Sequence, residues 1–250
     1  MSRAAAISGA GRTAATPSLL YVAGLGAPGA ALELSPEEAH YVSRVCRARA
    51  GDIVDATDGR GALARLRLLS VGAAVRAEVV SVERAQRGLR TWLLCGAPER
   101  GRADWLVEKL AELGVERLQP LEIEGAPWGA SAARPGRWNR LAVAALRQSR
   151  RPFLMEIAAP LRLEAALESL EHAAGRWLGD PAGRPAGGVT RSAAMEVGAI
   201  GPSAGFGPPE RARLDASGFV AIALASGRLR TETAALSLAA WMALPRAGGG

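Results

Sequence analysis

Glycine-containing segments follow two strand-like runs in the C-terminal half of the chain. The first is Gly201-Pro202-Ser203-Ala204-Gly205-Phe206, and it comes directly after an apolar run that ends at Ile200. Glycine lets a backbone approach a ligand closely, and amides at a helix N-terminus favour polar or anionic groups. The spacing matches neither a P-loop nor GxGxxG, so it does not predict a nucleotide phosphate site. Taken alone, the segment fits a structural turn between strand and helix at least as well.

The second segment, residues 224–234, carries charged groups at the end of a strand-like run. Arg228 and Arg230 stand where a strand gives way to a helix, an edge at which α/β sheets commonly bind ligands. Thr231 is placed to cap that helix, and Glu232 lies in its first turn. Two interpretations remain open here, because Glu232 also suits compensation of the helix dipole and the arginines also suit a solvated rim.

Several other site chemistries find little support in the sequence. Cys46, Cys95, His40 and His172 are isolated, whereas zinc and iron–sulfur sites need clustered ligands, so we expect no metal. Neither histidine lies beside a nucleophile-elbow motif, which argues against Ser-His-Asp catalysis. No uninterrupted apolar run approaches the roughly 20 residues of a membrane span, so we expect no integral membrane protein.

The composition is that of a folded protein with a basic surplus. Hydrophobic residues make up 49% of the 250 residues and charged residues 22%. Lys and Arg number 31 against 24 Asp and Glu, which gives a net charge of +7 and favours polyanions such as nucleic acid. Because Lys109 is the single lysine, the same surplus also fits the Arg-rich composition of a GC-rich genome.

The elements before residue 86 are short and strand-like. Apolar or alternating runs at residues 53–54, 63–69 and 75–82 are separated by turn signals, which predicts a small barrel or sandwich. One helix interrupts this pattern. Ser35 suits an N-cap and is followed by Pro and two Glu, which predicts a helix that extends over residues 39–49.

From about residue 90 onward, strands and helices alternate, which predicts an α/β domain with a mainly parallel sheet. Leucines spaced along residues 103–113 predict one buried helix face, and Gly114 is placed to end that helix. The remaining strands are expected at 92–95, 115–123, 176–178, 197–200 and 219–224. The remaining helices are expected at 137–149, 163–173, 208–217 and 231–244, and a loose Gly/Pro-rich stretch is expected from 179 to 191.

Taken together, these segments resemble the RsmE family, the 16S ribosomal RNA uracil-N3 methyltransferases of the SPOUT superfamily. The resemblance covers roughly residues 19–244. It rests on motifs in a fixed order, namely His40, Val45-Cys46-Arg47, Gly51-Asp52, Asp58-Gly59, Arg102-Ala103-Asp104, Lys109–Val115, Gln148-Ser149, Gly201–Phe206 and Arg230–Ala234.

The resemblance implies a fold that the residue pattern alone does not give. It implies a PUA-like β-barrel over residues 18–86, and then a SPOUT α/β domain over residues 90–246 whose C-terminal part is tied in a trefoil knot. It implies a homodimer that binds S-adenosyl-L-methionine (SAM) in the knot loops. The residues expected to bind SAM are Ile200, Gly201, Pro202, Gly205, Leu224, Ser226, Leu229 and Thr231, and those expected to bind RNA are His40, Arg44, Arg47 and Arg102.

The reaction that the family carries out places demands on the residues beside the methyl group. Uracil N3 carries a proton at neutral pH, so a base or a cation that stabilises the uracil anion is needed. We expect Arg230 to stabilise charge on a carbonyl oxygen, and Glu232 to orient Arg230 or to act as a base. Gln148, with Ser149, is expected to hydrogen-bond the edge of the uracil.

The sequence departs from the family pattern near these residues. The usual GPEGGF loses one Glu and one Gly in residues 201–206, and LGxRILR is altered over residues 224–230. Ala204 and Ala225 are the positions where a Cβ is expected to strain a backbone of positive φ. Further departures are Arg147 in place of an acid, Glu99-Arg100 in place of lysine-glycine, and the altered segment 122–128.

These departures keep three functions open. The leading one is methylation of a uridine N3 in 16S rRNA, with the assembled small ribosomal subunit as the expected substrate. The second is a non-catalytic RNA-binding relative with a degraded SAM pocket, and the third is a SPOUT methyltransferase with another RNA target. Residues 1–17 contain Arg3 and Arg12 but no acid, which is typical of a transit peptide. We favour a disordered extension or an early start codon over a targeting segment, so we expect a cytoplasmic protein.

Overall fold

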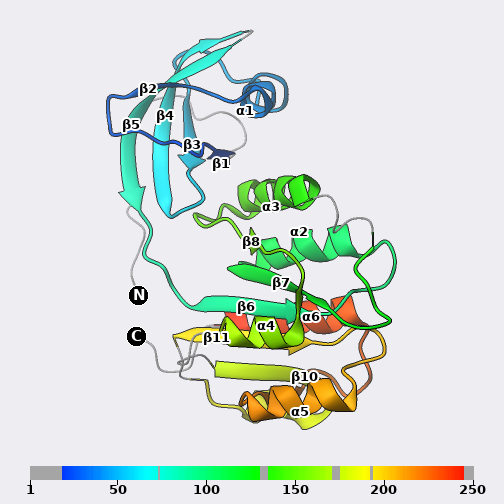
Figure 1. Cartoon of the computed structure of the whole chain (residues 1–250). Helices are drawn as coiled ribbons and strands as arrows, with labels where there is room; N and C mark the ends of the chain where they lie inside the picture. Colours follow the sequence, from blue (N-terminus) through cyan, green and yellow to red (C-terminus); the bar gives the residue numbers. More distant parts are fainter. Residues whose placement is uncertain (1–18, 73, 130–134, 171–174, 192–193, 245–250) are drawn as a thin grey trace. The chain divides into compact units, whose positions relative to one another are not determined.

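The computed structural model describes residues 19–72, 74–129, 135–170, 175–191 and 194–244. The chain divides into two compact units. In the described ranges the first unit comprises residues 19–87 and 146–154, and the second unit comprises the rest. Figure 1 shows both units, with labels on most of their helices and strands. The predicted N-terminal extension, residues 1–17, lies outside the described residues.

The first unit is built on a five-stranded sheet with the order β1-β3-β4-β5-β2. β3, β4 and β5 are antiparallel neighbours, and β1 pairs with β3 in parallel. Alternate residues of β4 and β5 are buried, and they pack with the helix into one apolar core. The strands are β1 (Leu19–Tyr21), β2 (Ala31–Glu33), β3 (Ile53–Thr57), β4 (Ala62–Val71) and β5 (Val75–Arg84).

The helix of the first unit begins as predicted but ends early. The Ser35 side chain accepts a hydrogen bond from the backbone N–H of Glu38 at 3.3 Å and caps α1 (Pro36–His40). The chain then widens into a π-helical turn, η1 (Tyr41–Val45). The prediction of helix to residue 49 is wrong, because Arg47 has a φ of 50° and a left-handed residue cannot continue a right-handed helix.

The second unit contains a parallel sheet with the order β12-β10-β11-β6-β7-β8. β8 pairs with the first residues of β7, and β9 pairs with its last two residues. Its strands are β6 (Arg90–Cys95), β7 (Arg117–Glu122), β8 (Glu156–Ile157), β9 (Leu161–Arg162), β10 (Gly175–Pro185), β11 (Met195–Ile200) and β12 (Val220–Ala223). Its helices are α2 (Ala103–Leu113), α3 (Pro135–Ser149), α4 (Leu163–Glu168), the 3-10 turn η2 (Ala186–Gly188), α5 (Pro208–Ala216) and α6 (Thr231–Ala243).

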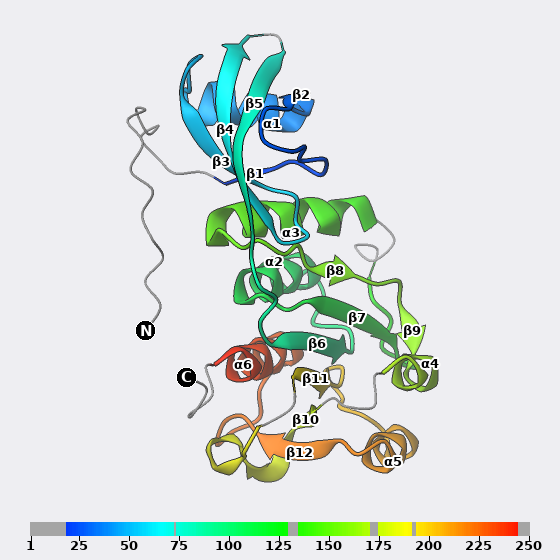
Figure 2. The ribbon, with the colours of Figure 1, turned by 90° about the vertical axis from the view of Figure 1, so that its left-hand side faces the viewer.

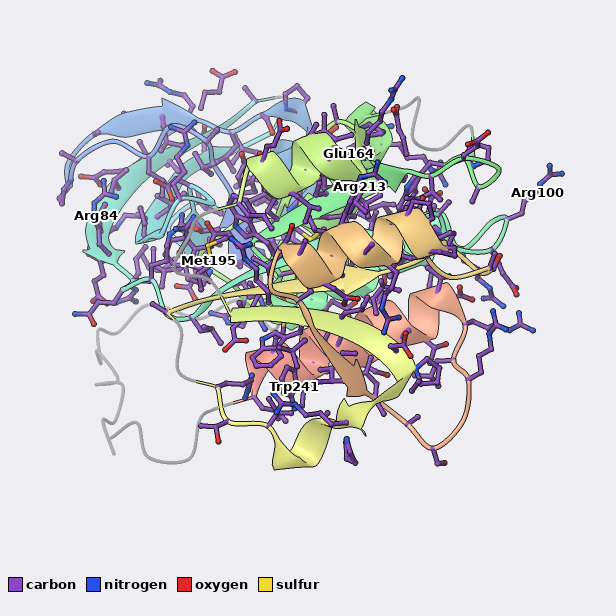
Figure 3. The ribbon with its side chains drawn as sticks, turned by 60° about the horizontal axis from the view of Figure 1, so that its bottom comes forward. Arg84, Arg100, Glu164, Met195, Arg213 and Trp241 are labelled. Atoms are coloured by element: carbon purple, nitrogen blue, oxygen red, sulfur yellow. The ribbon has the colours of Figure 1, made fainter. Side chains whose placement is uncertain are left out.

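Helices cover both faces of this sheet, as a buried parallel sheet requires. Figure 2 shows α2 and α6 on one face and α4 and α5 on the other. Gly198 of β11 lets α6 approach closely, because a Cβ there would lie 2.7 Å from a methyl group of Leu238. On the opposite face Glu164 of α4 and Arg213 of α5 point toward each other and pair at 3.0 Å (Figure 3).

Most predicted elements of the second unit are confirmed, and two are corrected. Helix 103–113 ends at Gly114, which has a φ of 80°, as predicted. The helix predicted over 163–173 is α4, which ends at Glu168. The stretch predicted to be loose after residue 178 continues as strand β10 to Pro185, with a shift of register against β12 between Gly179 and Arg184.

Candidate functional site

A cavity of about 410 Å³ opens in the second unit at the carboxyl ends of β11 and β12, beside the middle of β10. Its lining comes from three segments, residues 178–182, 200–206 and 224–231 without Ser226 and Arg230, together with Arg211 and Ala234. The carboxyl ends of parallel strands share one edge of a sheet, so loops that are distant in sequence meet there. The volume lies in the usual range for a small-molecule site.

The 201–206 segment is a tight turn that depends on glycine. Gly205 has a φ of 85°, and its N–H donates to the carbonyl of Pro202 at 2.8 Å. A Cβ on Gly201 would lie 2.9 Å from backbone atoms of Gly205 and Phe206. A Cβ on Gly96, at the end of β6, would lie 2.4 Å from the backbone nitrogen of Pro202. Backbone therefore packs on backbone at this wall of the cavity.

Two hydrogen bonds join this turn to the 224–231 segment. The Arg228 guanidinium donates to the carbonyl of Ser203 at 2.7 Å, and the Thr231 hydroxyl donates to the carbonyl of Gly201 at 3.2 Å. The structure thus brings together most of the residues predicted to bind a cofactor, with Ser226 outside the lining. Those in the lining are Ile200, Gly201, Pro202, Gly205, Leu224, Leu229 and Thr231.

The strain predicted at Ala204 and Ala225 is absent. Among the described residues, the non-glycine positions with positive φ are Arg47 and Arg150. In the 201–206 turn the left-handed conformation is taken by Gly205, so a Cβ on Ala204 costs no backbone strain. The two alanines therefore do not by themselves degrade the cavity.

The third wall of the cavity, residues 178–182, was not predicted as part of a site. A Cβ on Gly179 would lie 2.3 Å from a methyl carbon of Ile200, so this wall packs tightly against β11. Asp180 pairs with Arg211 of α5 and contributes a carboxylate to the cavity. The Gly-Asp-Pro sequence indicates a turn, whereas the structure has an irregular part of β10 here, and only the sheet order reveals that it lies beside the other two segments.

The predicted catalytic residues are not gathered around one point. Arg230 is exposed and pairs with Glu99, while Arg100 points away from the ribbon (Figure 3). Glu232 was predicted to orient Arg230, whereas in this structure the Arg230 guanidinium donates to the carboxylate of Glu99. Gln148 is exposed in the part of α3 that belongs to the first unit.

Glu232 is buried in the first turn of α6, with 4% of its surface exposed. Its Oε2 has no hydrogen-bond partner among the described residues. Burial, with a smaller contribution from the charge of Glu232, raises the pKa of Cys95 to about 12. A base must reach the proton that it removes, so this conformation favours the other interpretation of Glu232, compensation of the helix dipole.

The predicted RNA-binding residues lie on exposed surfaces of both units. His40, Arg44 and Arg47 are exposed within eight residues of the first unit, around α1 and η1. Arg102 is exposed in the second unit at the N-cap of α2.

In the described ranges no three His, Cys, Asp or Glu side chains are grouped to hold a metal ion. The same ranges contain no helix with the length and apolar character of a membrane span.

The sequence of the second unit matches a known family. The model of the RNA methyltransferase domain family matches residues 85–243, well over half of the chain. The chain belongs to this family. A ribosomal RNA small subunit methyltransferase E of Synechocystis sp. is 32% identical over 143 residues, and one of Mycobacterium bovis is 28% identical over 245 residues. These relatives confirm the predicted resemblance to the RsmE family.

The matches differ in how much of each protein they cover. They cover 56% of this chain and 47% of the Synechocystis methyltransferase, and 87% of both chains for the Mycobacterium bovis protein. With an Aquifex aeolicus methyltransferase E the share of the relative is 59%. The chain thus spans about half the length of the Synechocystis and Aquifex relatives it matches.

Solved structures share the fold of this methyltransferase family member. A ribosomal RNA small subunit methyltransferase E from Neisseria gonorrhoeae, bound to SAM, superposes with a TM-score of 0.82 at 23% identity. That comparison covers 91% of this chain and 97% of the other. A methyltransferase from Legionella pneumophila in complex with SAM gives a TM-score of 0.79 at 25% identity, over 92% and 97% of the two chains.

Proposed function

We propose that this protein is a SAM-dependent methyltransferase that methylates N3 of a uridine in 16S ribosomal RNA. The observation that carries the proposal is the cavity at the carboxyl ends of β11 and β12, in which the two segments predicted to bind SAM meet residues 178–182 of β10. Family membership and relatives named small subunit methyltransferase E support the reaction and the substrate.

The lining of the cavity fits SAM chemically. Apolar side chains of Leu178, Ile200, Leu224 and Leu229 suit an adenine ring. Charged side chains in the same lining suit the polar parts of the cofactor, and the glycine-dependent backbone supplies amides and carbonyls at close range. When bound there, SAM would supply an electrophilic methyl group on a sulfonium.

The residues of the chain then have to prepare the acceptor. Arg230 is exposed at the start of α6, one residue from the cavity wall at Thr231. In our proposal solvent water accepts the N3 proton, and the Arg230 guanidinium stabilises the negative charge that develops on uracil as the proton leaves. Glu99 holds this guanidinium in the free protein and yields it to the uracil carbonyl oxygen.

The wider assembly extends the same proposal. We infer a PUA-like barrel from the five-stranded sheet of the first unit, and a trefoil knot from the fold shared with the methyltransferases. His40, Arg44, Arg47 and Arg102 would hold RNA phosphates, and Gln148 would contact the base. The chain would act as a cytoplasmic homodimer on the small ribosomal subunit.

A titration followed by an activity assay tests the function. We expect one SAM per chain with micromolar affinity by calorimetry, and 3-methyluridine by nucleoside mass spectrometry after incubation with unmethylated small subunits. Arg230→Ala should lower turnover about 100-fold without changing SAM affinity, whereas Arg230→Lys should retain part of the rate. Absence of SAM binding by folded protein would favour the RNA-binding relative, and a different methylated base would favour another RNA target.

A further inference from the structure

The third wall of the cavity presents one carboxylate, that of Asp180. Its Oδ1 accepts a hydrogen bond from the backbone N–H of Ala182 at 2.7 Å, and its Oδ2 accepts one from the Arg211 guanidinium. Burial raises the pKa of Asp180, but the hydrogen bonds from Arg211 and Ala182 outweigh it and bring the pKa below its ordinary value. The carboxylate is therefore ionised at neutral pH.

This carboxylate still has room to accept hydrogen bonds. An ionised carboxylate offers about four acceptor positions, and the two contacts above occupy two of them. Of the described residues that line the cavity, Asp180 is the one acid. The Asp180 side chain is 18% exposed and lines the cavity. A ligand in the cavity can therefore reach the acceptor positions that Arg211 and Ala182 leave open.

The part of β10 that carries Asp180 is packed closely at both of its ends. A Cβ on Gly179 would lie 2.3 Å from Ile200, and a Cβ on Gly183 would lie 2.4 Å from the backbone nitrogen of Ile222. The segment between these glycines therefore sits between the ends of β11 and β12 with little space to move. An acceptor fixed in this way binds a ligand without a large cost of ordering.

The charge around Asp180 indicates which ligand group it suits. Arg211 neutralises the carboxylate, so the pair carries little net charge toward a cationic group such as an ammonium or a sulfonium. Hydroxyl groups need acceptor positions and not net charge. A ribose diol offers two O–H donors for the two open positions, and acids serve this purpose in other nucleoside-binding sheets.

We propose that Asp180 accepts hydrogen bonds from the ribose hydroxyls of the nucleoside bound in this cavity, and so makes the pocket selective for ribose over deoxyribose. The inference rests on the proposed function, because it takes SAM as the occupant. Asp180 would be a specificity-determining residue on the wall formed by residues 178–182, which was not predicted as part of the site.

Ligand analogues and a matched pair of variants test this role. Calorimetry would compare S-adenosylhomocysteine with its 2′-deoxy and 3′-deoxy analogues on the wild type, Asp180→Asn and Asp215→Asn. Asp215 is the control, since it lies 3.7 Å from the same Arg211 but does not line the cavity. We expect the wild type and Asp215→Asn to prefer the parent compound at least tenfold, and Asp180→Asn to prefer it less than threefold.

Other outcomes overturn the inference. Equal affinity of the wild type for parent and deoxy analogues would do so without any variant. A uniform loss of affinity for all three compounds in Asp180→Asn would show that Asp180 only keeps this part of β10 in place. If the folded wild type binds none of the compounds, the cofactor assigned in the proposed function is wrong, a result distinct from binding without ribose selectivity.

Discussion

The first unit joins β3, β4 and β5 as antiparallel neighbours, whereas the strands of the main sheet in the second unit pair in parallel. Antiparallel neighbours need only short turns. The exposed basic residues His40, Arg44 and Arg47 of the first unit also lie close together in sequence, because they belong to one helical segment, α1 and η1, and to the residues directly after it. Parallel neighbours need crossovers, which return the chain to the same edge. The cavity of the second unit therefore combines segments that begin at residues 178, 200 and 224.

The two units also differ in what they bury. The first buries Glu38 against Arg147, two residues 109 positions apart that both belong to this unit. The second buries Cys95 near the carboxylate of Glu232, close to the cavity loops. The buried Glu38 of the first unit is thus paired with an arginine, whereas the buried Cys95 of the second unit lies near another acidic group, and the difference is open to experiment.

The two cysteines provide the largest expected contrast. Because the pKa of Cys95 is about 12, only about one thiol in 10⁴ is ionised at pH 8, and the side chain is buried as well. Cys46 is partly exposed in the first unit. An aromatic disulfide reagent at pH 8 should therefore modify one thiol of the native protein and two after denaturation.

Cys46→Ser identifies the reactive thiol. The native variant should show no rapid modification, and raising the pH toward 10 should speed the slow reaction of Cys95 as more thiolate forms. Rapid modification of two thiols in the native wild type would contradict the buried position of Cys95.

The ion pairs of the two units give the next contrast. Glu38 is 2% exposed and Arg147 is 18% exposed at the side chain, whereas Glu99 and Arg230 are 42% and 64% exposed. Removing one partner of a buried pair leaves an unpaired charge, so Glu38→Ala should lower the free energy of unfolding by about 3 kcal/mol. Glu99→Ala should lower it by less than about 1 kcal/mol, since solvent screens that pair. Urea denaturation measures both.

A double variant separates loss of the pair from loss of packing. Glu38→Leu/Arg147→Met should recover part of the stability that Glu38→Ala loses, because no unpaired charge remains. Equal effects of Glu38→Ala and Glu99→Ala would contradict the difference in burial.

The local elements were predictable, and the long-range ones were not. Leucine spacing and Gly114 predicted α2, because both signals lie within one helix. The early end of the helix after Ser35 depends on the left-handed Arg47, which no local pattern indicated. The Asp180 wall escaped prediction for a similar reason: a Gly/Pro-rich sequence indicates turns, whereas its place as a strand beside β12 depends on tertiary packing.

In the candidate site, the residues of the cavity loops were predictable, and the partners of its charged side chains were not. Seven of the residues that the family resemblance implies as SAM ligands line one cavity, because their motifs stand in two short segments that each hold several of them. The partners of charged residues were not predictable. Arg230 with Glu99, Arg211 with Asp180 and Arg147 with Glu38 each join segments that meet only after folding.

Two glycines, one from each unit, provide the smallest contrast. A Cβ on Gly96 would lie 2.4 Å from the backbone of Pro202, whereas a Cβ on Gly24 would meet no atom within 4 Å. Gly96→Ala should therefore lower the free energy of unfolding by about 2 kcal/mol and weaken SAM binding, because the 201–206 turn must move away from β6. Gly24→Ala should change stability by less than about 0.5 kcal/mol and leave SAM binding unchanged. Thermal denaturation with and without SAM measures both effects, and unchanged SAM affinity in Gly96→Ala would show that the backbone contact at β6 does not shape the cavity.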